Sequence, residues 1–255
     1  MRVIDIDSAE FIKFIINLLR NSGDVCLEEI SDYDQKMLTM LYYSLYNSPI
    51  QNYNKVSDIF QTIFANEAVK DEILEILNYK YQNIDFVEKP LNLGFKTPLF
   101  LHCSYARNQI FSALDHYTLL NMPSHGQREG VIHLKDKNLD VFFITLNKTE
   151  KHYSPSTMYE DFAVNETLFH WQSQSTTSEN SPTGIRYINH DSNGARILLF
   201  VREFKEVNNR AQPFICIGTA RYVSHTGSRP MNITWRLDED MPAKFLKSAR
   251  KMILG

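Results

Sequence analysis

The sequence predicts an α+β protein in which an N-terminal helical region, residues 1–122, precedes a small antiparallel, barrel-like β module, residues 123–255. Apolar residues recur at helical spacing in the first part and alternate with a period of two in the second. Charge divides as well: residues 1–90 hold 8 Lys+Arg and 15 Asp+Glu, whereas residues 91–255 hold 19 and 15, with all 8 histidines. This division indicates two regions with different roles, although two faces of one fold would also produce it.

Helix signals occur in order along the first part. Ser8 is the expected cap of a first helix, and Ser31-Asp-Tyr-Asp34 fits the capping box of a second one. A third pattern begins at Asn66, and a Pro- and Gly-containing connector occupies residues 87–98. A fourth helix is expected over residues 105–120.

The second part predicts strands at 130–134 and 140–146, the latter apolar enough to be buried on both faces. Residues 184–190 and 195–202 flank Asp191-Ser-Asn-Gly194, and Asn-Gly is a strong hairpin signal. A second hairpin is expected to join 213–223 to 231–237, and a helix to close the chain over 243–252. Because short strands must hide their edges, we expect them to curl into a barrel.

Several classes of protein are excluded or disfavoured. No apolar run approaches the roughly 20 residues of a membrane span, and the N-terminus lacks a signal-peptide layout. Three unclustered cysteines predict neither a disulfide framework nor a zinc site. There is no phosphate loop, dinucleotide-binding turn, zinc-protease helix or nucleophile elbow. We therefore expect a cytoplasmic protein without a membrane segment or a bound cofactor.

One enzymatic alternative remains open, with magnesium as its cofactor. Glu203-Phe-Lys205 follows an apolar strand, and Glu-x-Lys in that position is half of a metal-dependent nuclease signature. Asp191 is too far along an extended strand, about 25 Å or more, to share the metal, which leaves Asp140, Glu160, Asp161 or Glu166. The other interpretation is a solvated strand end. A histidine could also serve as a general base; the candidates are His170, His190 and His225.

A DNA-binding interpretation is based on an accumulation of residues rather than a motif. Arginines grip phosphate or read a base edge, aromatic rings stack on bases, and the polar turn 224–229 suits phosphate contact. A barrel lined by aromatic and amide groups could also hold a flipped or modified base. The alternative is that the tryptophans are core residues and the arginines pair with acids such as Glu203 and Asp238. The candidate DNA-binding residues are Trp171, Arg186, Tyr187, Arg202, Arg221, Tyr222, His225 and Arg229, with Trp235 and Arg236 among the predicted strands.

Long motifs in the chain resemble a bacterial family. They include Glu166-Thr-Leu-Phe-His-Trp-Gln-Ser-Gln174 and Gly227-Ser-Arg-Pro-Met231, together with segments 153–161, 181–184, 186–190 and 197–203. The family is the domain-of-unknown-function family numbered 3427. It commonly occupies the C-terminal region of superfamily II helicases that also carry a phospholipase D-like nuclease domain. Segments 37–45 and 128–131 are similar to the family too.

The resemblance implies a biological context more than a mechanism. A DNA-recognition module of a restriction or anti-phage defence system is expected, with DNA as a partner and a helicase or nuclease in the same polypeptide or a separate chain. The resemblance supplies no catalytic residue, and it supports DNA binding by association only. A protein-interaction module that docks a helicase through the acidic helices is the third interpretation.

Overall fold

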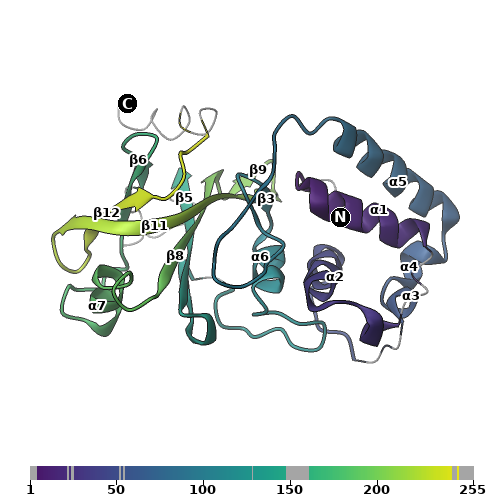
Figure 1. The fold of residues 1–255 in the computed structure, drawn as a ribbon, viewed down its shortest axis with the longest axis horizontal. Helices are drawn as coiled ribbons and strands as arrows, with labels where there is room; N and C mark the ends of the chain where they lie inside the picture. The colour runs from purple at the N-terminus through teal and green to yellow at the C-terminus, as the bar shows by residue number, and fades with distance from the viewer. Residues whose placement is uncertain are drawn as a thin grey trace. The chain divides into compact units, whose positions relative to one another are not determined.

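The computed structural model shown in Figure 1 describes residues 5–21, 23, 26–51, 53, 55–127, 129–147, 161–242 and 246. The chain divides into two compact units, Met1–Ser124 and His125–Gly255. Among the described residues, no helix is long and apolar enough to cross a membrane. The predicted order of helices followed by a sheet is confirmed.

The helices of the first unit begin where the sequence places their caps. Ser8 Oγ accepts a hydrogen bond from the Phe11 amide, and Ser31 Oγ accepts one from the Asp34 amide. α1 packs against α2 and α5, and α2 packs against α6. The helices are α1 Ala9–Arg20, α2 Asp32–Leu45, α3 Val56–Ile59, α4 Gln61–Phe64, α5 Glu67–Gln82 and α6 Arg107–Ala113, with a 3-10 turn at Leu27–Glu29; three short strands, β1 Lys89–Pro90, β2 Phe100–Leu101 and β3 Ser104–Tyr105, complete this unit.

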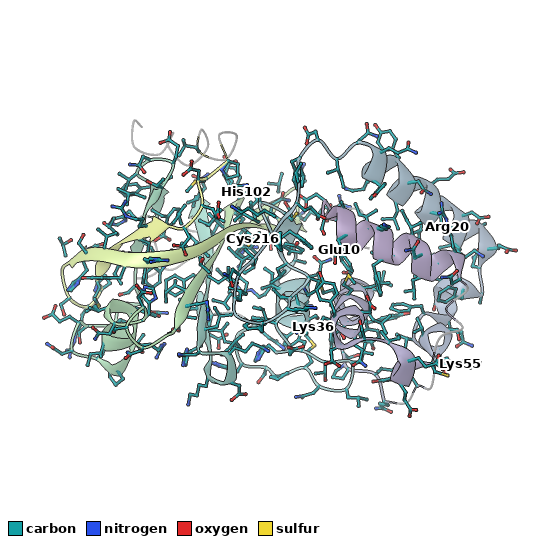
Figure 2. All side chains as sticks on the ribbon, in the orientation of Figure 1. Glu10, Arg20, Lys36, Lys55, His102 and Cys216 are labelled. Atoms are coloured by element: carbon teal, nitrogen blue, oxygen red, sulfur yellow. The ribbon has the colours of Figure 1, made fainter. Side chains whose placement is uncertain are left out.

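The fourth helix is shorter than the predicted range 105–120. It ends at Ala113 because Asp115 adopts a positive φ of 58°, which an α-helix does not continue through. The Asp115 carboxylate lies 2.9 Å from the ammonium group of Lys36, which is labelled in Figure 2. This ion pair holds Asp115, just after the end of α6, against α2.

The second unit contributes seven strands to one mixed sheet, in the order β4-β5-β8-β11-β12-β7-β6. β5 and β8 run parallel, and the other neighbouring pairs along this path are antiparallel. The strands are β4 Val131–Leu134, β5 Leu139–Asn147, β6 Phe162–Ala163, β7 Leu168–Gln172, β8 Arg196–Phe204, β11 Phe214–Thr226 and β12 Asn232–Leu237; a separate hairpin joins β9 Glu206–Val207 to β10 Arg210–Ala211, a 3-10 turn occupies Lys135–Lys137, and one helix, α7, occupies Pro182–Ile188.

The prediction of an antiparallel barrel is corrected in two respects. The sheet is mixed, and among the described strands its two end strands, β4 and β6, do not pair to close a barrel. The long connection from β5 to β8 contains α7, and a crossover of that kind returns the chain parallel to the strand it left. The strands β4 and β5 and the β11–β12 hairpin are confirmed.

The predicted hairpin through Asp191–Gly194 is wrong, because residues 182–188 form α7 instead of a strand. Ser181 Oγ accepts a hydrogen bond from the Gly184 amide, and Pro182 occupies the first helical position. A serine cap followed by proline is a helix start, and it outweighs the Asn-Gly signal that follows. The predicted closing helix, 243–252, lies outside the described residues except for Leu246.

We predict that Gly184→Ala destabilises the protein by about 2 kcal/mol or more, the typical result of overpacking. A Cβ at this position would clash with the carbonyl oxygen of Ser178 and would lie 3.1 Å from the sulfur of Met231. The matched control is Gly130→Ala, whose Cβ would meet nothing closer than 3.9 Å. Urea unfolding of both variants checks the prediction, and equal losses would contradict it.

Candidate nucleic-acid interface

Two of the predicted DNA-contacting rings lie in the core of the second unit. Trp171 is 5 % exposed and Tyr187 is fully buried. The centre of the Trp171 ring lies 4.4 Å from that of Phe142. The rings of Trp171 and Tyr187 also contact Trp235. Because these rings pack against other core rings, a DNA base could stack on Trp171 or Tyr187 only if the core opened. Neither residue is retained in the interface described below.

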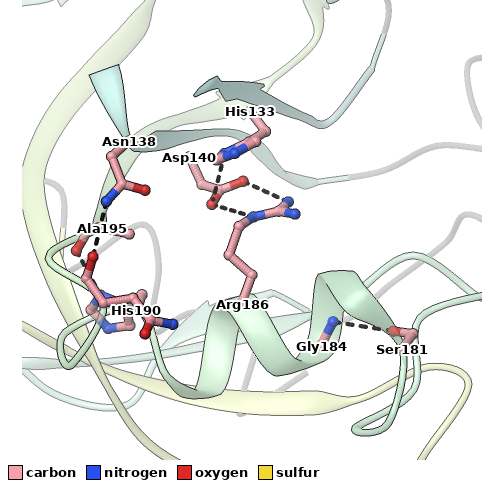
Figure 3. Close-up of polar contacts among 9 residues, drawn as sticks. His133, Asn138, Asp140, Ser181, Gly184, Arg186, His190 and Ala195 are labelled. Atoms are coloured by element: carbon pink, nitrogen blue, oxygen red, sulfur yellow. Dashed lines mark hydrogen bonds and ion pairs between the residues drawn. The ribbon is translucent and has the colours of Figure 1, made fainter. Parts of the chain in front are cut away.

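Arg186 holds α7 against the sheet. Its Nε and Nη2 atoms donate to the two carboxylate oxygens of Asp140 at 2.8 and 2.9 Å, and His133 Nδ1 lies 3.3 Å from the same carboxylate (Figure 3). The Asp140 side chain is completely buried in β5. Burial acts to lower the pKa of Arg186, but its bonds and charge pairing with Asp140 together raise the pKa above its ordinary value. Arg186 therefore stays charged and compensates a buried carboxylate.

Arg202 is also occupied within the protein. Its Nε donates to Thr145 Oγ1 at 3.0 Å, its Nη1 donates to the Gln212 carbonyl at 3.2 Å, and its guanidinium lies 4.2 Å from the centre of the Phe214 ring. A guanidinium stacked and bonded in this way joins β8 to β5 and to the start of β11. Its geometry is that of a structural cation.

Tyr222 and His225 of β11 lie on the same side of the sheet as Trp235, a core residue of β12. The Tyr222 hydroxyl shares a 2.6 Å hydrogen bond with His225 Nδ1, and His225 Nε2 lies 3.5 Å from a Glu179 carboxylate oxygen. Since Nε2 faces an acceptor, Nδ1 of neutral His225 accepts from the hydroxyl. Both side chains are partly exposed, in the half of β11 that leads into the turn of the β11–β12 hairpin.

His190 fixes the backbone of the same strand. Its Nε2 accepts a hydrogen bond from the Tyr222 amide at 3.0 Å, and its Nδ1 donates to the Ala195 carbonyl at 3.3 Å (Figure 3 shows the Ala195 side). This pair of bonds needs the neutral ring, with one nitrogen as acceptor. Burial lowers the pKa of His190 below its ordinary value, in keeping with that role.

The opposite side of the β11–β12 pair carries two exposed arginines. Arg221 on β11 and Arg236 on β12 stand directly opposite each other, and Ser224 and Thr234 form the next opposed pair of similar orientation. We call this surface, Arg221, Ser224, Thr234 and Arg236, the arginine face. Trp235 and Leu237 alternate with it and point into the core.

Arg229 is exposed in the turn that connects β11 to β12. Its backbone has a φ of 63°, and its amide donates to the Thr177 carbonyl at 3.1 Å. The Ser173 amide donates to the Met231 carbonyl, and the Met231 amide donates to Ser173 Oγ, both at 2.9 Å. The Ser/Thr-rich segment before α7 therefore supports the turn and presents Arg229 on a fixed backbone.

The structure thus separates the eight predicted residues rather than gathering them. Arg221 and Arg229 are exposed near the hairpin, Tyr222 and His225 lie on its other side, and the remaining four are structural. Arg236 completes the arginine face; the signal for it was the alternation of Thr234, Trp235 and Arg236 along the strand. The expected pairing of an arginine with Asp238 is confirmed at Arg221, whereas Asp140, the partner of Arg186, could not be assigned from local sequence.

The alternative nuclease residues lie at the end of β8. Glu203 is exposed and Lys205 is partly exposed. Among the residues that the structure describes, no group of three or more His, Cys, Asp and Glu side chains could hold a metal ion. Glu160, one of the acids considered as a partner, lies outside those residues.

Comparison with known proteins gives a family but no curated relative. Residues 99–248 match the family described as "Domain of unknown function (DUF3427)". No curated protein matches the chain. Among solved structures, the DNA recognition domain of the cytosine modification-dependent restriction endonuclease LpnPI is similar over 39 % of this chain and 53 % of that one, with 11 % identity and a TM-score of 0.22. A TM-score this low does not establish a shared fold.

We predict that Arg186→Met costs about 3–5 kcal/mol of stability, because it leaves the Asp140 carboxylate buried without a partner. The same substitution at Arg221, whose pair with Asp238 is exposed, should cost at most about 1 kcal/mol. Adding Asp140→Asn to Arg186→Met should restore part of the loss. Chemical unfolding of the wild type, Arg186→Met, Asp140→Asn, their double variant and Arg221→Met tests this, and additive losses in the double variant would refute the coupling.

A second prediction concerns pH. The folded protein holds His190 neutral with a lowered pKa, whereas the unfolded chain binds a proton near pH 6.5. The contribution of His190 is therefore full above pH 6.5 and decreases below it, by up to about 1.4 kcal/mol per pH unit. The difference in unfolding free energy between the wild type and His190→Gln, measured at pH 7.5 and 5.5, should shrink at the lower pH. A difference independent of pH would contradict this role.

Proposed function

The chain belongs to the DUF3427 family, and because that description carries no activity, we propose from the geometry that its second unit is a DNA-recognition module. The arginine face and Arg229 contact the DNA, with Tyr222 and His225 on the other side of the same hairpin. In this proposal the module serves a restriction or anti-phage defence system and acts with a helicase and a nuclease, in the same polypeptide or as a separate chain.

The observation that supports the proposal most is the placement of Arg221 opposite Arg236. Like charges directly opposite each other on neighbouring antiparallel strands destabilise the pair. Asp238 pairs with Arg221, but no hydrogen bond or ion pair to the Arg236 side chain is present among the described residues. A protein gains little stability from such an arrangement, whereas a polyanion that binds there is stabilised by both charges.

The charge of the region agrees with an anionic partner. Residues 91–255 carry 19 Lys+Arg against 15 Asp+Glu, while the helical residues 1–90 carry 8 against 15. An antiparallel pair of strands is also an element that can enter the major groove of duplex DNA. The excess of positive charge is modest, so we expect few phosphate contacts and a shallow salt dependence.

A second candidate function concerns the first unit, which would dock a helicase partner. The end of α5 and the segment after it expose Tyr79, Tyr81, Phe86 and Val87, and α5 carries exposed acids at Glu67, Asp71 and Glu75. Exposed aromatic side chains beside charged ones are common at protein interfaces. This candidate is compatible with DNA binding by the second unit, because different surfaces are used.

We predict that Arg236→Gln and Arg229→Gln each weaken duplex binding by roughly tenfold, the usual effect of losing one charge-assisted hydrogen bond. Each should also reduce the slope of log affinity against log salt by about 0.9. Titration of a labelled random-sequence 20-bp duplex in metal-free buffer, at several salt concentrations, measures both quantities. Arg210→Gln, which removes an exposed arginine on β10, is the matched control and should change neither. If the wild type did not bind the duplex even at low salt, the proposed DNA-recognition function would be wrong.

A further inference from the structure

The two opposed arginines are held differently, and that difference bears on what each one recognises. Arg221 Nε donates to Asp238 Oδ1 at 2.9 Å. Asp238 is itself fixed: Thr219 Oγ1 donates to its Oδ2 at 2.6 Å, and its amide donates to the Thr219 carbonyl at 2.9 Å. Arg236, by contrast, has no such support among the described residues.

The support of Arg221 leaves the outer edge of its guanidinium unused. Only Nε is bonded, and among the described residues no hydrogen bond reaches Nη1 or Nη2. The side chain is 61 % exposed. The structural arginines of the same unit differ in this respect: Arg186 uses Nε and Nη2 on Asp140, and Arg202 uses Nε and Nη1 on Thr145 and Gln212. Arg221 is therefore held through Nε alone, and its Nη1 and Nη2 donors are not bonded within the described structure.

Stability does not account for this arrangement. An exposed ion pair contributes little to folding, because solvent screens it and two side chains lose freedom. A guanidinium can also bind a phosphate with two hydrogen bonds, but the tetrahedral group offers pairs of oxygens in several planes, so a fixed orientation is less important there. It matters where two acceptors must be met at once in one plane, as on the major-groove edge of guanine, where O6 and N7 lie side by side.

We propose, on the basis of the DNA-binding function above, that Arg221 reads guanine through Nη1 and Nη2 and that Asp238 is its positioning residue. Arg236 and Arg229, which lack a carboxylate to orient them in the described structure, contact phosphates. Arg221 thus determines base preference, while the other two arginines determine affinity and its salt dependence.

The experiment compares two random-sequence 20-bp duplex pools, one with guanine and one with 7-deazaguanine, which lacks the N7 acceptor. The wild type should bind the guanine pool about tenfold more tightly, within the range of one bidentate base contact. Arg221→Lys keeps the charge but loses the planar fork, so its ratio between pools should fall to the background due to DNA shape alone.

The pair Asp238→Asn and Asp238→Ala separates positioning from charge. Both variants remove the negative charge and should increase affinity for either pool. Asparagine still offers an oxygen to Arg221 Nε, so Asp238→Asn should keep the preference for guanine, whereas Asp238→Ala should lose it. If Asp238 only neutralises Arg221, the two variants will show the same ratio.

Each outcome decides the matter. Equal binding of both pools by the wild type, or an unchanged ratio in Arg221→Lys, overturns the guanine-reading role while DNA binding stands. An unchanged ratio in Asp238→Ala overturns the positioning role of Asp238. Absence of binding to both pools overturns the proposed function and this inference together. Urea unfolding midpoints of the variants, compared with the wild type, establish that each one is folded before its affinity is interpreted.

Discussion

The second unit depends on one buried ion pair. Asp140 lies in a strand whose side chains are otherwise almost entirely apolar and buried, and a carboxylate there must be compensated by hydrogen bonds and charge. Arg186 provides both, but only if α7 lies against the sheet beside β5. The next residue, Tyr187, then enters the aromatic core, and His190 just beyond the helix accepts the amide of Tyr222 on β11. The need to compensate the Asp140 carboxylate thus fixes α7 against the sheet, and with α7 it places Tyr187 in the core and His190 against β11.

Regular hydrophobic patterns made most of the sheet predictable. The continuous apolar run of β5 and the alternation in β11 and β12 were sufficient to locate those strands, and the capping residues located the first two long helices. The error at 184–190 arose because Ile185, Tyr187 and Asn193-Gly194 imitate a strand and turn, while Ser181 and Pro182 start a helix. That error made the predicted sheet wholly antiparallel, because a hairpin in place of a crossover leaves out the parallel pairing of β8 with β5.

The candidate site was less predictable. The sequence shows which residue types lie on each strand, but it does not show which distant residues their side chains contact. Sequence alone indicated a set of arginines and also stated the opposite interpretation, in which they pair with acids. The pairing with acids is confirmed for Arg186 and Arg221, whereas DNA contact by the arginines stays a prediction. Arg186 and Asp140 are 46 residues apart in the sequence, and Arg202 and Thr145 are 57 apart. At such separations the tertiary fold, and not the local sequence, determines which side chains pair. Arg221 and Asp238 are 17 residues apart, and their meeting follows from the hairpin register.

The hairpin joins two chemically distinct surfaces through one strand. Along β11, Tyr222 and His225 lie toward the core side, where His190 and Glu179 engage them, while Arg221 and Ser224 lie on the arginine face. The register shift between Tyr222 and Ser224 sets this division, since a β-bulge re-aims the side chains that follow it. Arg186 on α7 and Arg202 on β8, which each donate two side-chain hydrogen bonds to the protein, build the frame. The arginines on the hairpin retain donors that solvent or a ligand must satisfy, and that is the physical basis for placing recognition there.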